Sequence, residues 1–302
     1  MLRIQDCLSF KDQVGRVYKT EKMVLSLREN AKVYTVMDSN QYLFVRFFGE
    51  NNPSESGIRT MCDCSSAEIV KANVLWPELI CYQLDNDMFC GFLARRIDIP
   101  DDLSLLSQMV LHADSSNVDI TTKLVIGLNL AKCIQAVHRT PRRFVIGAPQ
   151  PRDFHVSPDG SVLFCYAYRC ELDTRNQHNS LYFAPEYRAM QSGLTTNSDA
   201  FSFAMILFVL LTGVFPFGAH EPEINFDEQQ IADMILNGES IYYYENSPHS
   251  VSIDGMISAI SPDLSRLFRL TFDYCGQSQY DDNRPSIADW ISALERNIHM
   301  VK

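Results

Sequence analysis

Cysteines are the most reactive side chains in this 302-residue sequence, and of the nine only Cys62 and Cys64 lie close together. A structural zinc site needs four ligands, so such a pair would have to be joined by a second pair or by histidines. Neither follows at ligand spacing, and most of the remaining cysteines lie in apolar runs such as residues 131–134. We therefore expect ordinary reduced thiols, and no metal site, at Cys62 and Cys64.

The histidines and arginines do not indicate a hydrolase or a nucleic-acid binder. No Ser-His-Asp or Cys-His constellation is suggested by local context. His138 ends a predicted amphipathic helix, where an imidazole suits the negative end of the helix dipole. Arg139, Arg142 and Arg143 form a small basic patch, but the formal net charge of -11 disfavours general binding to phosphate backbones.

The elements that must position these residues change type along the chain. Hydrophobic residues make up 46% and charged residues 21%, values typical of a soluble globular protein with a core. β-branched and aromatic runs predict strands, and a polar stretch, residues 49–57, precedes a predicted helix near 65–73 that is capped by Ser65 or Ser66. The strands are expected at residues 22–27, 32–37, 41–48, 79–84 and 88–93.

After Pro100 the hydrophobic period becomes helical. Residues 120–137 predict an amphipathic helix, and a short β segment follows around residues 155–166. Further helices are expected at 198–212, 228–237, 262–274 and 286–297. The apolar stretch 200–214 is shorter than the roughly 20 residues of a membrane span, so we expect a helix buried on all sides. Residues 1–6 are too charged for a signal peptide.

Five short motifs follow one another in the C-terminal half, and their order and spacing carry more information than any one of them. They are Ala184-Pro185-Glu186, Ser198-Asp199, Leu210-Leu211-Thr212-Gly213, Pro216-Phe217 and Asn283-Arg284-Pro285-Ser286. Together they resemble the C-terminal lobe of the protein-kinase superfamily, and the resemblance extends over residues 22–294. Residues 76–93 and 267–291 look most similar to bacterial eukaryotic-like Ser/Thr kinases. The resemblance implies a buried ion pair between Glu186 and Arg284, and hydrogen bonds from the catalytic-loop backbone to Asp199.

Phosphoryl transfer in this superfamily requires a glycine loop and a lysine on the third strand. Alignment on Val33 places Ser26, Arg28 and Ala31 at the three glycine positions. Their side chains would obstruct the close approach of backbone to phosphate that glycine permits. We therefore expect that the phosphate-binding loop is lost.

The third strand reads Phe44-Val45-Arg46 where the family has Ala-Val-Lys. Arg46 keeps the positive charge of the lysine but not its compact ammonium geometry, and Glu68 is its expected partner on the following helix. Phe44 stands where a small alanine covers the adenine, so its ring is expected to occupy the space of the nucleotide.

The catalytic loop of the family, His-Arg-Asp-Leu-Lys-Pro-x-Asn, aligns with residues 146–153. The general-base position is Ala148, which accepts no proton, and the loop lysine is replaced by Gln150. Asp153 replaces the metal-binding Asn and remains a competent magnesium ligand. The family's Asp-Phe-Gly is replaced by Tyr166-Ala167-Tyr168, and a phenol that ionises near pH 10 does not hold magnesium at neutral pH.

These observations predict an α+β fold of the bilobal protein-kinase-like type, with a small antiparallel β-rich N-lobe at 1–97 and a larger, mostly helical C-lobe at 98–302. The predicted function is that of a pseudokinase, a cytoplasmic scaffold or allosteric partner that is not an enzyme. Its partner would be a protein such as an active kinase or a phosphatase, and neither nucleic acid, membrane, metal nor cofactor is expected.

Two alternatives remain open. Asp153 could support phosphoryl or nucleotidyl transfer with weakly bound ATP and Mg or Mn held in a non-standard way. A small-molecule kinase of the antibiotic-phosphotransferase type is the other alternative. Kinases of that type keep their catalytic Asp and lack the Ala-Pro-Glu and Arg-Pro motifs, so this sequence fits them less well.

Overall fold

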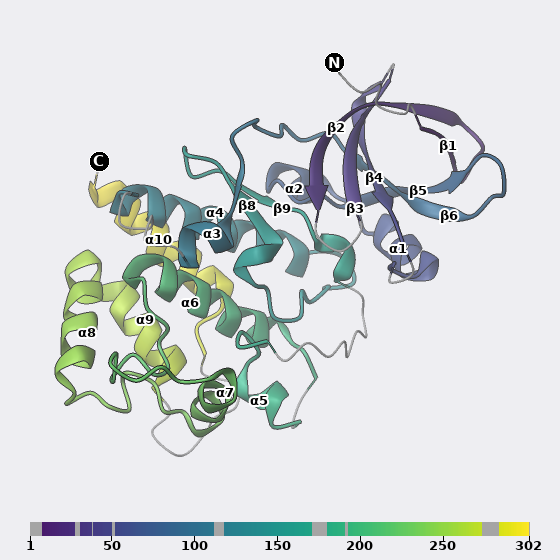
Figure 1. Cartoon of the computed structure of the whole chain (residues 1–302). Helices are drawn as coiled ribbons and strands as arrows, with labels where there is room; N and C mark the ends of the chain where they lie inside the picture. Colours follow the sequence, from purple (N-terminus) through teal and green to yellow (C-terminus); the bar gives the residue numbers. More distant parts are fainter. Residues whose placement is uncertain are drawn as a thin grey trace.

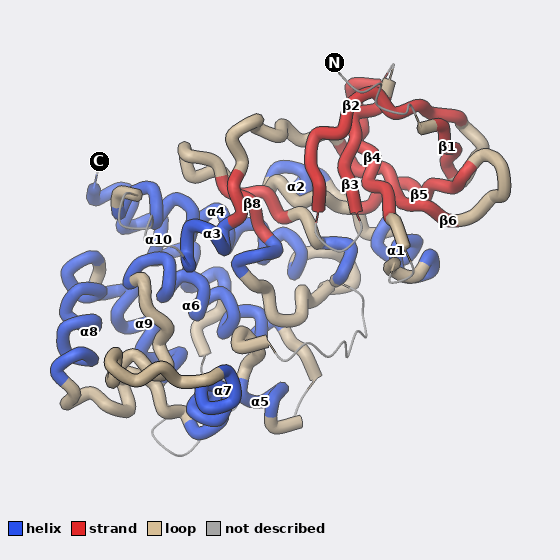
Figure 2. The backbone as a smooth tube through the Cα atoms, in the orientation of Figure 1, coloured by secondary structure: helices blue, strands red, loops and turns tan. Residues whose placement is uncertain are grey.

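The protein is described by a computed structural model that covers residues 8–27, 31–37, 39–49, 52–111, 118–170, 180–190, 193–273 and 284–301. Strands gather in the N-terminal part of the chain and helices in the C-terminal part, as Figure 2 shows by colour. The chain is thus a mixed helix and strand protein with a β-rich N-terminal region. Arg28 of the predicted glycine loop lies outside the described residues.

The β-rich region is a closed barrel with the strand order β1-β2-β3-β4-β6-β5 (Figure 1). All neighbouring strands in it are antiparallel. The strands are β1 (Ser9–Asp12), β2 (Val17–Leu27), β3 (Ala31–Val36), β4 (Ser39–Phe47), β5 (Pro77–Gln83) and β6 (Phe89–Arg95). The five strands predicted from the sequence correspond to β2 to β6, and the barrel ends at Arg95, near the expected junction.

Strand β1 was not predicted, and it closes the sheet by pairing with β2 on one side and β5 on the other. A buried carboxylate fixes the turn that follows it. Asp12 accepts hydrogen bonds from the backbone N–H groups of Val14 and Arg16, each at 2.9 Å, and from the Tyr18 hydroxyl at 3.0 Å. This turn holds β1 against the start of β2.

A three-stranded sheet and the helices form the rest of the molecule. The sheet has the order β7-β8-β9, with β7 (Ser104–Leu105), β8 (Phe154–Val156) and β9 (Val162–Phe164). The helices are α1 (Glu55–Cys62), α2 (Ala67–Lys71), α3 (Leu106–Leu111), α4 (Ile120–His138), α5 (Pro185–Arg188), α6 (Thr196–Thr212), α7 (Glu228–Asn237), α8 (Pro248–Ile260), α9 (Pro262–Phe272) and α10 (Ile287–Val301). Two short 3-10 turns, η2 (Pro151–Asp153) and η3 (Ala167–Arg169), lie between them.

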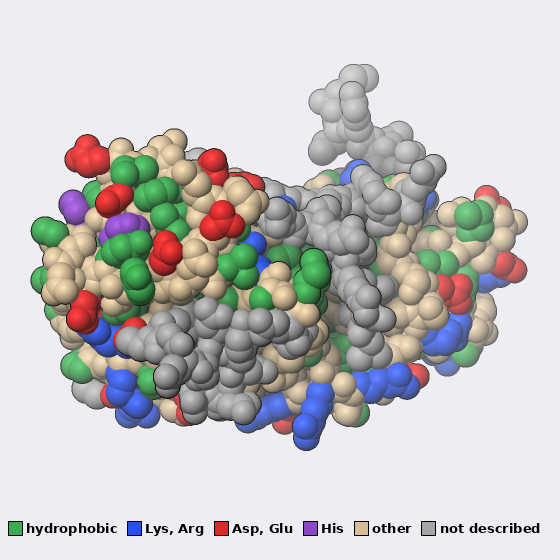
Figure 3. Space-filling model, turned by 90° about the horizontal axis from the view of Figure 1, so that it is seen from below, with side chains coloured by type: hydrophobic (Ala, Val, Ile, Leu, Met, Phe, Trp, Pro, Cys, Tyr) green, Lys and Arg blue, Asp and Glu red, His purple; other side chains and the backbone are tan. Residues whose placement is uncertain are grey.

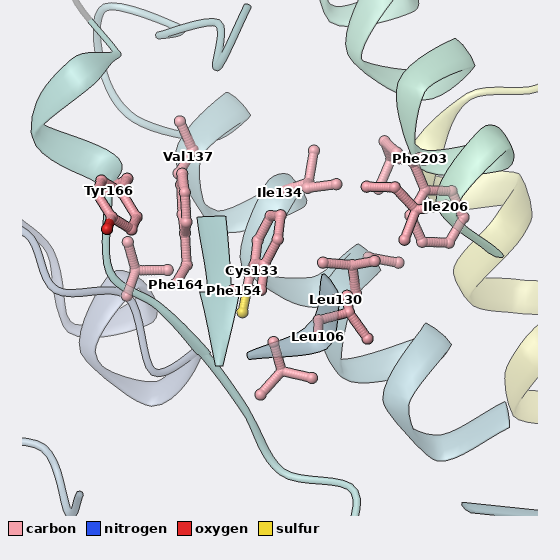
Figure 4. Close-up of a cluster of buried hydrophobic side chains, with 14 of the residues drawn as sticks. Leu106, Leu130, Cys133, Ile134, Val137, Phe154, Phe164, Tyr166, Phe203 and Ile206 are labelled. Atoms are coloured by element: carbon pink, nitrogen blue, oxygen red, sulfur yellow. The ribbon is translucent and has the colours of Figure 1, made fainter. Parts of the chain in front are cut away.

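Helix α6 is the centre of the helical region, and every residue from Ser198 to Leu211 is buried, as the sequence predicted. Thr195 caps its start by accepting a hydrogen bond from the Ser198 N–H at 3.1 Å. Gly213 ends it with a φ of 77°, a left-handed conformation that glycine adopts without a steric penalty. Phe203 and Ile206 of this helix face Leu130 and Ile134 of α4 in the core (Figure 4).

Four helices in the described chain were not predicted, namely α1, α3, α5 and α8. Helix α1 begins inside the polar stretch 49–57, where the Ser54 side chain accepts a hydrogen bond from the Gly57 N–H at 3.0 Å. Helix α8 begins at Pro248, whose fixed φ and missing N–H suit the first helical turn. Only two residues of each of these helices are buried, too few for hydrophobic periodicity alone to reveal them. Helices α3 and α5 have only six and four residues.

Helix α4 is long and apolar enough to cross a membrane by length and composition, but half of its apolar window is buried inside the protein. It packs closely against α10, α6 and β9. This packing is typical of a core helix.

Candidate functional site

The loop at residues 146–148 is held by one buried carboxylate, that of Asp199 in the first turn of α6. Its Oδ2 accepts the N–H of Ile146 at 2.7 Å, and its Oδ1 accepts the N–H groups of Gly147 at 2.9 Å and Ala148 at 3.3 Å. Gly147 and Ala148 have φ values of 79° and 65°, which turns successive N–H groups towards the same acceptor. The hydrogen bonds that the resemblance implied for Asp199 are therefore present.

His138 completes this arrangement in a way that the sequence did not reveal. Its Nε2 lies 2.8 Å from Oδ2 of Asp199, whose side chain is fully buried. His138 ends α4, as the sequence predicts, and its side chain contacts a carboxylate that lies 61 residues away in the sequence. The end of α4, the loop and the start of α6 are thereby joined at one point.

The predicted pair of Glu186 and Arg284 is also formed. The guanidinium donates from one nitrogen to Oε1 at 2.8 Å and from the other to Oε2 at 3.0 Å, with both side chains almost fully buried. Arg284 donates further to the carbonyl of Asn197 at 2.9 Å and lies over the ring of Phe201. The two-point geometry links α5, the start of α6 and the segment before α10.

Ala148, at the general-base position, is buried and ends in a methyl group. Gln150 directly precedes η2 and Asp153 is its last residue, whose Oδ2 accepts the backbone N–H of Gln150 at 2.9 Å. Asp153 therefore caps its own turn. No group of three or more His, Cys, Asp or Glu side chains that could hold a metal ion occurs within the described ranges.

Residues 166–168, at the Asp-Phe-Gly position, are buried and lead into η3. Burial raises the pKa of the Tyr168 phenol, an effect reinforced by the nearby charge of Asp153, so this group stays protonated at neutral pH. The Tyr166 ring lies 5.9 Å from that of Tyr168 and 5.5 Å from the Arg169 guanidinium. Neither phenol offers the carboxylate oxygens that magnesium prefers as ligands.

Aromatic rings join this segment to the barrel. The Tyr168 ring lies 5.1 Å from that of Phe47 at the end of β4 and 6.1 Å from that of Phe92 in β6. Phe47 is itself 5.8 Å from Phe92 and 5.8 Å from Phe89. We call Phe47, Phe89, Phe92 and Tyr168 the interface cluster, because these rings connect the barrel with the segment after β9.

The position of Phe44 corrects the sequence interpretation. Its ring stacks on Phe10 of β1, with centroids 3.8 Å apart and planes inclined by 11°. Both belong to a small core to which all six barrel strands contribute, so Phe44 fills the interior of the barrel. Adjacent residues of a strand face opposite sides, and it is Val45 and Phe47 that join the main core outside the barrel.

Arg46 shares the face of Phe44 and lies over the ring of Phe48 at 4.7 Å. Glu68 is exposed on α2, and no ion pair of the described chain joins it to Arg46, so that expected pair was wrong. Of the glycine positions, Ser26 pairs with Lys32 in the β2–β3 hairpin and Ala31 is buried as the first residue of β3. Both residues lie in the strands on either side of residues 28–30, which are outside the described residues.

One Cys-His contact was missed. The Sγ of Cys165 lies 3.3 Å from Nδ1 of His155, and both side chains are buried. The two residues are ten positions apart: His155 lies in β8, and Cys165 directly follows β9, whose pairing with β8 the sequence alone did not fix. Burial raises the pKa of the Cys165 thiol well above its usual value, so it is not an activated nucleophile. Burial likewise raises the pKa of Cys62 to about 12, so neither thiol is activated.

Comparison with known proteins finds similarity to serine/threonine-protein kinases. No protein-family model matches the chain. Over 280 residues, 87% of its length, the chain is 22% identical to the serine/threonine-protein kinase TNNI3K of Rattus norvegicus, and the same values hold for those of Mus musculus and Homo sapiens. The chain spans 29% of the length of each of these curated relatives. These similarities support a distant protein-kinase-like relationship.

Proposed function

We propose that the chain is a catalytically inactive protein-kinase-like protein, a pseudokinase, that acts as a scaffold or allosteric partner of another protein. The barrel with α1 and α2 would be the N-lobe of a bilobal fold, residues 1–97, and the remainder its C-lobe, residues 98–302. The distant relationship to a kinase supports this assignment, as do the buried Glu186–Arg284 pair and the Asp199-bound loop.

The observation that carries the proposal is the contact between Phe47 and Tyr168. In a kinase, the third strand and the Asp-Phe-Gly segment hold the nucleotide and its magnesium between them. Here the corresponding elements meet directly through two rings. With Ala148 at the base position, no side chain remains there to accept the proton of a substrate hydroxyl.

The expected loss of rate is large. Removing a single catalytic group typically lowers kcat by about a thousandfold or more, and combined losses of groups that act together do not simply add. The base, the magnesium Asp and the strand Lys are all replaced in this sequence. Asp153, on which the alternative of a relocated transferase depends, is engaged as the cap of η2.

Thermal unfolding in the presence and absence of ATP with Mg or Mn tests the proposal. A ligand present at a hundred times its Kd adds about 2.7 kcal/mol to the free energy of unfolding, so binding would be visible. We expect no shift, and no transfer of phosphate from labelled ATP to the chain or to general kinase substrates. An active protein kinase measured alongside serves as the positive control. A clear shift together with transfer would refute the proposal and favour the transferase alternative.

The remaining parts of the proposal follow from the sequence. We place the protein in the cytoplasm, with a protein partner such as an active kinase or a phosphatase, and without a required cofactor.

A further inference from the structure

The negative charge of the protein is concentrated in one segment. Residues 189–265 contain ten of the 37 Asp and Glu residues and none of the 26 Lys and Arg residues. The rest of the chain is therefore almost neutral, although the whole carries a formal net charge of -11. Such a separation of charge produces a local field that selects oppositely charged partners.

Within this segment, most of the acidic side chains lack a compensating cation. Asp254 and Asp263 are paired with Arg269 and Arg296, and Asp199 is buried. No ion pair of the described chain involves the other seven, of which all but the half-buried Glu239 are exposed. These seven residues are Glu221, Glu223, Asp227, Glu228, Asp233, Glu239 and Glu245.

The hydrogen bonds of these carboxylates come from neutral groups. Asp227 caps α7 by accepting the N–H of Gln230 at 2.8 Å, and Asp233 accepts from the Gln229 side chain at 2.9 Å. Glu239 accepts from the Asn237 side chain at 3.0 Å. These contacts fix the carboxylates in place without neutralising their charge.

Packing around His220 brings the acidic residues to one side of the helical region. The His220 ring stacks on Tyr244, with centroids 3.7 Å apart, and the Ser247 hydroxyl donates to the His220 carbonyl at 3.0 Å. The Ile241 N–H donates to the carbonyl of Pro216 at 2.9 Å. The segment before α7 and the segment after it therefore lie side by side. We call the surface formed by residues 221–228, 233, 239 and 243–245 the acidic face.

Apolar side chains are exposed on the acidic face. Tyr243 is 60% exposed and Ile224 is 50% exposed. In the upper left of Figure 3, acidic and hydrophobic side chains are seen together over the helical region. Tyrosine is frequent among the residues that contribute most to binding at protein interfaces, because its ring offers a large and rigid contact area.

We propose that the acidic face is a docking surface for a basic protein segment that carries apolar side chains. Lys and Arg of the partner would lie against the unpaired carboxylates, and its apolar side chains against Tyr243 and Ile224. An acidic peptide or a nucleic acid would be repelled by the same charges. The inference rests on the proposed function, for which it specifies the chemistry of the protein partner.

Two fluorescent 16-residue peptides of equal charge test the proposal, one of Lys and Leu and one of Lys and Ser. Anisotropy with the full chain at 150 mM salt gives the affinities. We expect the Lys-Leu peptide to bind about tenfold more tightly than the Lys-Ser peptide, because only the former covers the exposed apolar groups. The variant Tyr243→Ser should bind the Lys-Leu peptide more weakly than the unchanged protein does, and its affinity for the Lys-Ser peptide should be unchanged.

A matched pair of charge variants locates the binding. The acidic-face variant carries Glu221→Gln, Glu223→Gln, Glu228→Gln and Glu245→Gln. The control removes the same number of exposed charges elsewhere through Asp85→Asn, Asp98→Asn, Asp101→Asn and Asp102→Asn.

We expect the first variant to lose about tenfold or more in affinity and the control less than about twofold. Equal losses of affinity in the two variants, or equal affinities for the two peptides, would overturn the proposal that the acidic face is a docking surface. Neither result would alter the nucleotide measurements that test the proposed function, and nucleotide binding would leave the peptide results unchanged.

Discussion

The ring of Tyr168 meets the ring of Phe47 edge to face, with centroids 5.1 Å apart and planes inclined by 61°. Phe47 is the last residue of β4, and Tyr168 lies in η3, more than a hundred residues later. Because Phe92 contacts both rings, three aromatic side chains connect the barrel with the segment after β9. Under the proposed function, this contact lies where a kinase uses polar groups.

If the interface cluster is the main obstacle to nucleotide binding, ATP and Mg should raise the Tm of the Phe47→Ala variant. They should not raise the Tm of the unchanged protein. The control is Phe44→Ala, since both rings are buried and each truncation should cost about 3–5 kcal/mol of stability. Only the first opens space beside Tyr168. An ATP-dependent rise in Phe44→Ala alone would show that the obstacle lies inside the barrel.

The Glu186–Arg284 pair should contribute strongly to stability. Glu186→Gln leaves a buried guanidinium without its counter-charge, and we expect a loss of about 3–5 kcal/mol in the free energy of unfolding. Urea denaturation measures it. Asp263→Asn breaks the exposed pair with Arg296 and should cost no more than about 1 kcal/mol. Similar losses of stability in the two variants would show that the buried pair stabilises the protein no more than the exposed pair does.

Asp199→Asn should loosen the loop at residues 146–148. An amide side chain offers one acceptor oxygen where the carboxylate offers two, so at least one backbone N–H loses its partner. Hydrogen exchange at Ile146, Gly147 and Ala148 should become faster by about tenfold or more. Asp159→Asn, which changes the exposed turn at residues 157–161, should leave these three amides unaffected. Unchanged exchange in Asp199→Asn would contradict the assigned role.

His220 should make stability fall in mild acid. Burial lowers its pKa below the ordinary value, outweighing the opposing charges of Glu221 and Glu239, while the rings of Tyr244 and Phe226 face the imidazole. The unfolded chain then binds a proton more readily than the folded one, so stability is complete above about pH 6.5 and is lost as the pH falls through the folded pKa. His220→Gln should show a smaller loss between pH 7.5 and pH 5.5 in urea denaturation. An equal loss in both proteins would exclude His220 as the cause.

The helical region was well predicted because its signals are local and strong. The start of α6, its buried length and the Glu186–Arg284 pair all followed from short motifs and from a run of apolar residues. The partner of His138 did not follow, because the two residues of that contact are 61 positions apart. A sequence does not directly show which distant residues meet in space, unless a known motif includes both of them.

Five of the six barrel strands were predicted, but the faces of β4 were not. In the pairing of β3 with β4, Val33 lies opposite Val45 and Tyr34 opposite Phe44. Neighbouring residues of a strand face opposite sides, so an alignment that is displaced by one residue assigns every side chain to the wrong face. The alignment named Phe44 as the ring beside the nucleotide position, whereas Phe47 lies at the interface. Strand β1 has only four residues, too few to show alternation.

Closure of the barrel by β1 restricts how a partner can bind. Each of the six described barrel strands has a hydrogen-bonded neighbour on both sides, and β1 covers residues 17–19 of β2 and 81–83 of β5. A foreign strand could therefore not be added where β1 already pairs. The β2–β3 hairpin is likewise tied through β2 to β1, and lifting it would break two ladders and not one. At the end of the barrel that β1 closes, recognition must therefore be made by side chains.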